Sequence, residues 1–275
     1  MQQTKRITLH ERNMNLDKLR QIYDQEQRMD VIYPDTERMV VPDVVRMIDR
    51  AGHEGMVLHS SLTDDNIDAI IEREIAYFTS IGQGFEWKVF EHDYPADLKE
   101  RLGARGFIIE DEEAILMLDL EDAPEALFRP VTQDVRQITA ADEMFEAFRV
   151  QNRVWGEDYD WLAERLANDL RANPDYLSVF VAYADGLPVC SAWVNFPSGN
   201  RFAGLWGGST LPEYRGRGLY SALVNVRAQL ARERGRRFLT VDASPMSLPI
   251  LQKFGFQRIS TAFPCKWPPP TGAEG

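Results

Sequence analysis

The chain has 275 residues, enough for one large domain or two of ordinary size, and its 44% hydrophobic residues can form a packed core. Residues 1–125 carry a formal charge of −14 and residues 126–275 a charge of +2, so the overall charge of −12 comes from the first half. This balance argues against nucleic acid as a partner, and it makes the second half the better place to seek an anionic ligand.

The sequence contains no apolar stretch long enough for a signal peptide or a membrane span, so we expect a cytoplasmic protein with no membrane partner. Only two cysteines are present, Cys190 and Cys265, and all four histidines lie in the first half. These counts argue against a disulfide framework and against a zinc site of cysteine and histidine ligands. We therefore expect no bound metal.

In the first half, the spacing of apolar residues predicts mostly helix over residues 16–50, a strand at 56–59 and an amphipathic helix from Ile67. A strand at 85–90 and a helix at 95–104 follow. Gly106 then ends that helix as a left-handed cap, before a strand at 114–118.

The second half begins with a predicted strand at 135–138, helices at 140–153 and 161–172, and strands at 177–184, 188–195 and 201–210. It then repeats the order seen in the first half. An amphipathic helix starts at Leu219, and strand 237–241, helix 247–253, a stop at Gly255 and strand 258–263 follow.

This repeated order predicts two tandem domains, residues 1–122 and 128–267, joined by an acidic, proline-containing linker. The two Gly-Phe stops lie about half the chain apart. The alternative is coincidence, because strand, helix, Gly-Phe and strand is a common order in proteins that mix helices and sheets.

The segment from residue 209 to 223 carries the clearest chemistry. A strand enters the short loop Arg215-Gly216-Arg217-Gly218, which opens the helix at Leu219. Glycines allow successive backbone N–H groups to form a concave nest, and the helix N-terminus adds partial positive charge. The loop is therefore a candidate anion site, and the alternative is an ordinary tight turn between strand and helix.

The loop resembles the acetyl-CoA pyrophosphate loop of the GNAT N-acetyltransferase superfamily: arginine or glutamine, two residues, glycine, one residue, and glycine or alanine. Tyr220 departs from this pattern, because the family has a small residue there. The Phe254-Gly255-Phe256 stop and the strand after it also match, so the likeness covers most of residues 128–265. It implies an α/β (α+β) fold of two tandem GNAT-like domains, each a mixed, mostly antiparallel twisted sheet flanked by helices.

The resemblance implies acetyl-CoA as co-substrate, with its pyrophosphate on the loop amides and its pantetheine arm along the strand before the loop. Most of the five further arginines, at 227, 232, 234, 236 and 237, are interpreted as a solvated helix face. The implied cofactor residues are Ser209, Thr210, Leu211, Arg215, Gly216, Arg217, Gly218, Leu219, Tyr220, Ser221 and Ser244.

The corresponding loop of the first domain, residues 60–66, has neither glycine nor arginine. Asp64 and Asp65 would lie where phosphates should bind, and like charges disfavour CoA there. We therefore interpret the first domain as a degenerate GNAT-like domain without a cofactor site.

The residues for proton transfer are less evident. Many GNAT enzymes have a carboxylate on the strand before the loop, but residues 201–208 contain none, and Leu251 stands where a tyrosine acid is common. The candidates are Asp242 and Tyr214, with Tyr220 also beside the loop. A structural hydrogen bond at the strand end is an equal interpretation of Asp242.

A cluster between the first two helices of the second domain, where the family forms its acceptor pocket, contains Glu157, Asp158 and Asp160 among aromatic residues. Such carboxylates suit a cationic amine, and Trp206 is a further acceptor candidate. An equal interpretation is that Asp158 or Asp160 caps a helix, and packing on the sheet is the favoured interpretation of Trp206.

Three functions follow. The first is transfer of an acyl group, usually acetyl, from CoA to an amine of a small molecule or peptide. The second is non-catalytic binding of CoA or another ligand by a regulatory protein that keeps the fold. The third is transfer of an aminoacyl group to a large acceptor. A monomer and a homodimer are both compatible with the sequence.

Overall fold

The computed structural model describes residues 9–269, so residues 1–8, the start of the region searched for a signal peptide, lie outside the described residues. Tertiary contacts divide the chain into two compact units. The N-terminal unit runs to Ile115 and resumes at Arg258, and the C-terminal unit is Leu116–Gln257. The expected range 128–267 thus includes a last segment that belongs to the N-terminal unit.

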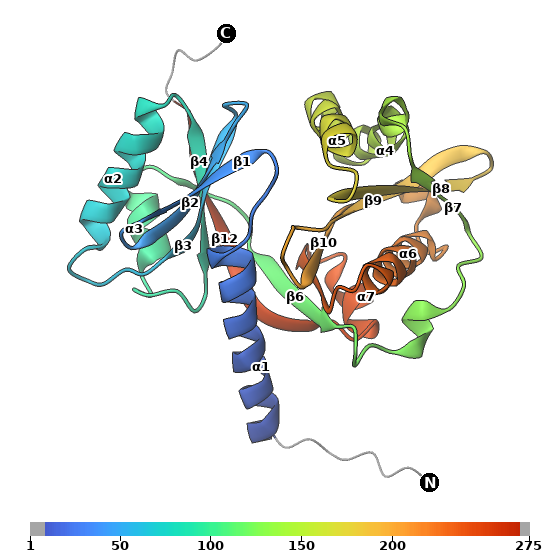
Figure 1. Cartoon of the computed structure of the whole chain (residues 1–275), viewed down its shortest axis with the longest axis horizontal. Helices are drawn as coiled ribbons and strands as arrows, with labels where there is room; N and C mark the ends of the chain where they lie inside the picture. Colours follow the sequence, from blue (N-terminus) through green and yellow to red (C-terminus); the bar gives the residue numbers. More distant parts are fainter. Residues whose placement is uncertain (1–8, 270–275) are drawn as a thin grey trace. The chain divides into compact units, whose positions relative to one another are not determined.

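Both division points lie inside strands, β6 (Glu113–Asp119) and β12 (Gln257–Trp267) (Figure 1). In sequence order, β6 is the last strand of the first half and β12 the last strand of the second. The division gives most of β6 to the C-terminal unit and nearly all of β12 to the N-terminal unit. Each unit therefore takes a strand from the end of the other half.

The N-terminal unit is a mixed sheet with helices. Strands β1 to β3 pair antiparallel, β3 and β4 pair parallel, and β12 pairs antiparallel with both β4 and β5. Its elements are α1 (Leu9–Tyr23), a π-helical segment (Asp24–Met29), β1 (Thr36–Val41), β2 (Val44–Asp49), β3 (Glu54–Ser60), α2 (Ile67–Ser80), β4 (Gly84–Phe90), α3 (Leu98–Ala104) and β5 (Ile108–Ile109).

The prediction of helix over residues 16–50 is wrong for its second part. Helical structure ends at Met29, and the hairpin of β1 and β2 follows, with Val41 opposite Val44. Pro42 and Asp43 form the turn between them, with Asp43 at a φ of +66°. Valines at positions 40, 41, 44 and 45 favour a strand, and pairing with β3 outweighs the helical spacing.

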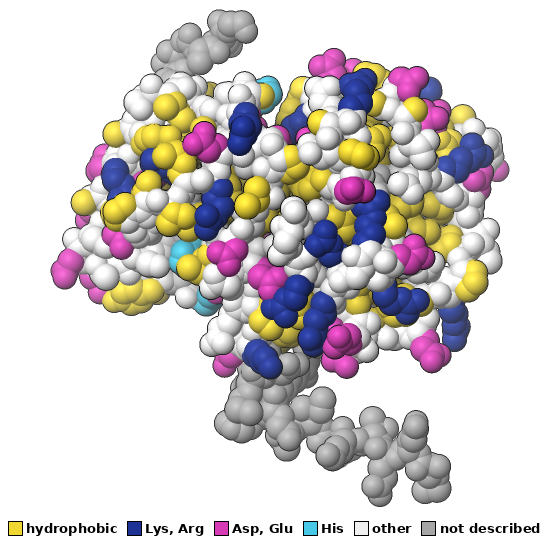
Figure 2. All heavy atoms as spheres, in the orientation of Figure 1, with side chains coloured by type: hydrophobic (Ala, Val, Ile, Leu, Met, Phe, Trp, Pro, Cys, Tyr) yellow, Lys and Arg dark blue, Asp and Glu magenta, His cyan; other side chains and the backbone are white. Residues whose placement is uncertain are grey.

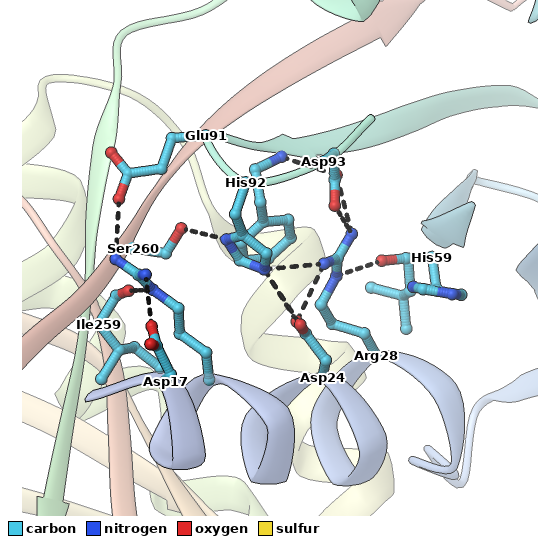
Figure 3. Close-up of polar contacts among 12 residues, drawn as sticks. Asp17, Asp24, Arg28, His59, Glu91, His92, Asp93, Ile259 and Ser260 are labelled. Atoms are coloured by element: carbon cyan, nitrogen blue, oxygen red, sulfur yellow. Dashed lines mark hydrogen bonds and ion pairs between the residues drawn. The ribbon is translucent and has the colours of Figure 1, made fainter. Parts of the chain in front are cut away.

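A cluster of charged side chains joins the helical segment of the N-terminal unit to its sheet (Figure 3). Arg28, only 2% exposed, binds Asp93 through two bonds of 2.8 Å and Asp24 at 2.9 Å, and its guanidinium lies over the Phe90 ring. His92 contacts Asp24 at 3.0 Å through Nε2. The buried arginine thus has both carboxylates as partners, which offsets the cost of removing its charge from water.

This cluster predicts a specific loss of stability in acid. Burial would raise the pKa of Asp24, but hydrogen bonds from His92 and Arg28 outweigh it and lower the pKa below its ordinary value of 3.8. A lowered folded-state pKa stabilises the protein above that ordinary value, and this contribution disappears as the pH falls through the lowered one. Asp24→Asn should lose about 1–2 kcal/mol at pH 7 in urea unfolding, and the loss should shrink steadily as the pH falls below 3.8. A loss that stays constant as the pH falls would contradict this assignment.

The C-terminal unit has an antiparallel run β7 to β10, followed by β11 parallel to β10. Helices α4 and α5 lie on one side of this sheet, and α6 lies on the other (Figure 1). The elements are β7 (Asp134–Ile138), α4 (Met144–Trp155), α5 (Asp160–Ala172), β8 (Leu177–Ala184), β9 (Leu187–Asn195), β10 (Phe202–Thr210), α6 (Leu219–Glu233), β11 (Phe238–Ala243) and α7 (Leu248–Lys253), with 3-10 turns at Glu125–Phe128, Ala141–Glu143 and Pro212–Tyr214.

The two units repeat one pattern, as the sequence predicts. In each, a strand leads into a long helix and returns as a parallel neighbour: β3, α2 and β4 in the first, β10, α6 and β11 in the second. The parallel pairing ends early in both, at Val57 opposite Trp87 and at Gly204 opposite Thr240. The mixed, mostly antiparallel sheets flanked by helices confirm the predicted fold class.

Each unit has its own apolar core. Trp87, Phe78 and Phe85 are fully buried in the first, and Phe148, Met144 and Val179 in the second. On the face shown in Figure 2, acidic and basic side chains are interspersed rather than gathered by sign. No helix within residues 9–269 is long and apolar enough to cross a membrane.

Candidate functional site

The loop between β10 and α6 has the geometry that its glycines predict. Gly216 and Gly218 both have a φ of +76°, and Gly218 is the N-cap of α6. The amides of the first helical turn have no acceptor within the helix, so they face out from the loop with the positive end of the helix dipole. Arg215 and Arg217 are exposed beside them. The loop therefore combines backbone donors with positive charge, which suits a phosphate group.

Strand β10 is irregular where it approaches this loop. Its register with β9 shifts between Trp206 and Ser209, which skips Gly207 and Gly208. Gly207 has a φ of +59°, and a Cβ atom there would lie 1.8 Å from the Trp193 ring. Beyond Gly204 the pairing with β11 has ended, although both strands continue. This bulge (residues 206–209) thus lies where β10 and β11 separate.

A cavity of about 560 Å³ occupies this region of the C-terminal unit. The bulge, the loop, the first turn of α6, the end of α4 and the start of α7 contribute its walls. The lining residues are Val154, Trp155, Gly208, Ser209, Thr210, Tyr214, Arg215, Gly216, Gly218, Leu219, Tyr220, Ser221, Ser244, Met246, Ser247 and Ile250. The wall therefore combines hydroxyl and backbone donors with apolar side chains such as Val154, Met246 and Ile250.

A chain of hydrogen bonds runs from the cavity wall to the bulge. The Trp155 indole N–H donates to Ser209 Oγ at 3.1 Å, and Ser209 donates to Gln151 Oε1 at 2.8 Å. Gln151 Nε2 in turn donates to the Gly207 carbonyl at 2.5 Å and to Ser191 Oγ at 2.9 Å. Gln151, Ser191 and Ser209 are all buried, so each bond replaces one that water would otherwise supply.

Arg227 is an exception among the arginines interpreted as a solvated helix face. Rather than belonging to a solvated helix face, it is 1% exposed and donates to the carbonyls of Trp193 at 3.1 Å and Trp206 at 3.3 Å. Burial lowers the pKa of its guanidinium. Arg232, by contrast, is exposed on α6, as that interpretation requires, whereas Arg237 is exposed but lies beyond α6, which ends at Glu233.

Removing Arg227 should therefore cost stability. We expect Arg227→Met to lower the free energy of unfolding by about 2–3 kcal/mol, because buried carbonyl oxygens lose their donors. Arg232→Met on the same helix is the matched control, since its guanidinium lies over the Phe128 ring at 3.6 Å and its loss should cost under about 1 kcal/mol. Urea unfolding of both variants measures the difference, and equal losses would contradict a structural role for Arg227.

The structure brings nine of the eleven predicted cofactor residues together around the cavity. The two others are adjacent to it in sequence but do not line it. Leu211 is buried and Arg217 is exposed, with its guanidinium 4.8 Å from the Tyr214 ring centroid. The segment from β10 to α6 thus converges on one site, which Ser244 joins from the residues after β11.

The candidates for proton transfer lie in different positions. Tyr214 lines the cavity, and its hydroxyl is 3.5 Å from Asp185 Oδ2. Tyr220 also lines it, and burial raises the pKa of its hydroxyl, so this group is protonated near neutral pH. Asp242, on β11, is partly buried and does not line the cavity. Among the residues that line it in the described part of the chain, none is Asp, Glu or His.

The acceptor candidates are mostly engaged in local contacts. Asp158 accepts a bond from the Asp160 amide at 2.9 Å, Glu157 accepts one from the Tyr159 hydroxyl at 2.9 Å, and Asp160 accepts one from Asn152 at 3.2 Å. None of the three carboxylates lines the cavity. The Asp158 contact lies at the start of α5, but the N-cap of that helix is Tyr159 and no side chain caps it with a hydrogen bond, so the helix-capping interpretation is not confirmed. Trp206 is 39% exposed and likewise stands outside the lining residues.

Sequence reasoning missed part of the wall. Trp155 is 58% exposed and lines the cavity, although it belongs to the same aromatic cluster from which the three carboxylates were chosen. Met246, Ser247 and Ile250 line it from the start of α7 and the residues before it. A tryptophan directly before the glycine that ends α4 was a usable signal. The residues at and before α7 carry no such sequence signal. They reach the cavity because β10 and β11 separate beyond Gly204, which is a feature of the folded sheet.

The corresponding loop of the N-terminal unit is built differently. Asn66 Oδ1 accepts a bond from the Thr63 amide at 2.7 Å, and Thr63 Oγ1 accepts one from the Asn66 amide at 3.3 Å. Asp64 and Asp65 are exposed beside this pair. Side chains of this loop thus already accept hydrogen bonds from backbone amides that precede α2. The two aspartates make the local charge negative. Among the described residues of the chain, no three His, Cys, Asp or Glu side chains could hold a metal ion.

Comparison with known proteins agrees with this geometry. Residues 141–256 match the model of the acetyltransferase (GNAT) family. No curated protein matches. A solved structure described as a GCN5-related N-acetyltransferase from Kribbella flavida has a TM-score of 0.66 and 16% identity, covering 93% of this chain and 96% of that chain.

Two further structures are similar at low identity. A conserved protein of unknown function from Staphylococcus epidermidis has a TM-score of 0.62 and 14% identity, covering 86% of this chain and 96% of that chain. A tandem GNAT protein from the clavulanic acid biosynthesis pathway has a TM-score of 0.58 and 15% identity, covering 92% and 87%. The C-terminal unit therefore contains a GNAT-family domain, and the chain as a whole has the fold of the tandem GNAT proteins.

Proposed function

We propose that the protein is an acyl-CoA-dependent N-acyltransferase that transfers an acetyl group from acetyl-CoA to an amine of a small molecule or peptide. The observation that carries this proposal is the cavity, which joins the donor-rich loop before α6 to the edge where β10 leaves β11. The CoA pyrophosphate binds the amides at the start of α6, with Arg215 and Arg217 beside it. The pantetheine arm lies along the free edge of β10.

The bulge supplies the donor for the thioester carbonyl. The C=O and N–H of a trans peptide point in opposite directions, so holding the Gly207 carbonyl on the side of α4 directs the Gly208 N–H away from α4. Gly208 itself lines the cavity. Its N–H stabilises the negative charge that develops on the carbonyl oxygen when the amine attacks.

The amine attacks in its neutral form. An alkylamine with a pKa of about 10.4 must lose a proton near neutral pH, and Asp242 and Tyr214 are the candidates that carry it away directly or through water. The C–N bond forms, the C–S bond breaks, and the CoA thiolate leaves. Glu157, Asp158, Asp160 and Trp206 remain candidates for binding the acceptor amine.

The N-terminal unit is proposed to be a degenerate GNAT-like domain that binds no CoA. Its loop carries Asp64 and Asp65 in place of glycine and arginine, and its donors before α2 are partly taken by Thr63 and Asn66. Each feature disfavours a pyrophosphate.

A second candidate function is non-catalytic binding of CoA or another ligand by a regulatory protein. It is favoured by the lack of Asp, Glu and His among the described residues that line the cavity. Release of the CoA thiol from acetyl-CoA, measured with a panel of small amines and peptides, separates the two. Release that depends on an amine supports the transferase. Saturable acetyl-CoA binding without release on the whole panel supports the regulatory protein.

A further inference from the structure

Residues behind the cavity wall hold the bulge in β10 from both sides of the sheet. Gln151, on α4, donates to the carbonyl of Gly207 at 2.5 Å, and Arg227, on α6, donates to that of Trp206 at 3.3 Å. Gln151 is 4% exposed and Arg227 is 1% exposed. In a regular sheet, such carbonyls accept hydrogen bonds from the backbone N–H groups of a neighbouring strand. Here, side chains from two helices supply the donors for two consecutive peptides instead.

The chemistry of the groups in this network determines which atom donates and which accepts in each hydrogen bond. Gln151 donates two bonds through Nε2, to Gly207 O and to Ser191 Oγ, and the Ser191 hydroxyl donates onward to the Ala147 carbonyl at 3.0 Å. Its Oε1 accepts from Ser209, whose oxygen accepts from the Trp155 indole. The indole can only donate and the carbonyls can only accept, so the amide of Gln151 has one allowed orientation.

We propose that Gln151 and Arg227 are positioning residues for acyl transfer: Gln151 holds the peptide whose Gly208 N–H is directed toward the thioester carbonyl, and Arg227 holds the peptide before it. This inference rests on the proposed function. Neither residue lines the cavity, so neither touches substrate, and each acts through the backbone of the bulge. Fixed orientation matters because a donor stabilises the transition state only if it is already aimed at the oxygen.

The same chain connects the bulge to the exposed wall. Trp155 is 58% exposed, lines the cavity and binds Ser209, which also lines it. The chain from Trp155 through Ser209 to Gln151 thus links an exposed side chain to the peptide that carries the donor. Ser209→Ala, which removes the middle of this chain, should weaken the positioning without removing the bond from Gln151 to Gly207.

The test compares Gln151→Met with Gln229→Met in the full chain. Gln229, on α6, also donates to two backbone carbonyls, Arg129 at 2.9 Å and Leu127 at 3.3 Å, but it lies outside the cavity and the bulge. We expect Gln151→Met to lower kcat about 10- to 100-fold with the Kd for acetyl-CoA unchanged, and Gln229→Met to leave both unchanged. Ser209→Ala should lower kcat by less than Gln151→Met.

A pH profile of Gln151→Glu adds a readout that a purely structural role would not change. An ionised glutamate cannot donate to the Gly207 carbonyl, whereas a protonated one can. The ratio of its kcat to that of the unmodified protein should therefore rise as the pH falls. If the unmodified protein releases no CoA thiol with any amine, the proposed function fails. If it does so and kcat is unaffected in Gln151→Met, or the ratio for Gln151→Glu is flat, the positioning role is overturned.

Discussion

Replacing Gly218 with glutamate is expected to lower the affinity for acetyl-CoA about 1,000-fold, because like charges brought together in a binding site cost several kcal/mol. Gly218 is the N-cap of α6 and lines the cavity, so the new carboxylate would occupy the position proposed for the pyrophosphate. Calorimetric titration with acetyl-CoA measures the loss. Circular dichroism checks that the variant is folded.

The control for this substitution lies at the other end of the same helix. Gly235 has a φ of +70° against +76° for Gly218, so glutamate brings the same charge and a similar backbone strain of about 1–2 kcal/mol at either position. A Cβ atom at Gly235 would meet nothing within 4 Å. Gly235→Glu should bind acetyl-CoA as the unmodified protein does. A folded Gly218→Glu variant with unchanged affinity would move the phosphate site away from this loop.

The second large effect concerns where the chain can be cut. A fragment of residues 128–267, the domain expected from sequence, should fail to unfold cooperatively, whereas residues 116–257 should unfold in one transition. The fragment that begins at residue 116 keeps five buried side chains, Leu116, Met117, Leu118, Leu120 and Leu127. Each is worth about 1.5–3 kcal/mol, and their sum is comparable to the whole stability of a domain.

Backbone contacts explain the same preference. The Leu116 carbonyl accepts a bond from Thr240, and the Leu120 amide donates to the Arg237 carbonyl at 2.8 Å, both within the C-terminal unit. The fragment that begins at residue 128 loses these contacts and retains β12 without β4, with which it pairs in the intact chain. Urea unfolding followed by circular dichroism compares the two fragments. Equal midpoints would contradict the exchange of end strands.

Much of the fold could be predicted because local patterns and final structure agree. The strands at residues 177–184 and 188–195 follow from runs of apolar residues around Asp185-Gly186, and the structure confirms both to within one residue. The loop at Arg215 to Gly218 could be predicted because its glycines take positive φ values that other residues avoid. These features depend on neighbours in sequence, so the sequence contains their signal.

Other features depend on contacts that are distant in sequence. Nothing near Gln257 indicates that the strand after it pairs with β4, because the partner lies far along the chain. Arg227 has the sequence spacing of a solvated helix face, but its side chain is buried. Its hydrogen bonds to the carbonyls of Trp193 and Trp206 offset the cost of removing its charge from water. The bond from Gln151 to Gly207 likewise joins residues from separate elements. Such pairings require the assembled sheet.

We propose that the chain has one CoA site and that this site lies in the C-terminal unit. Calorimetric titration of the full chain with free CoA tests this most directly, since it reports affinity and the number of sites together. The expected result is saturable micromolar binding of one CoA per chain. Absence of binding would contradict a functional loop before α6, and two CoA molecules per chain would contradict the degenerate character of the N-terminal unit.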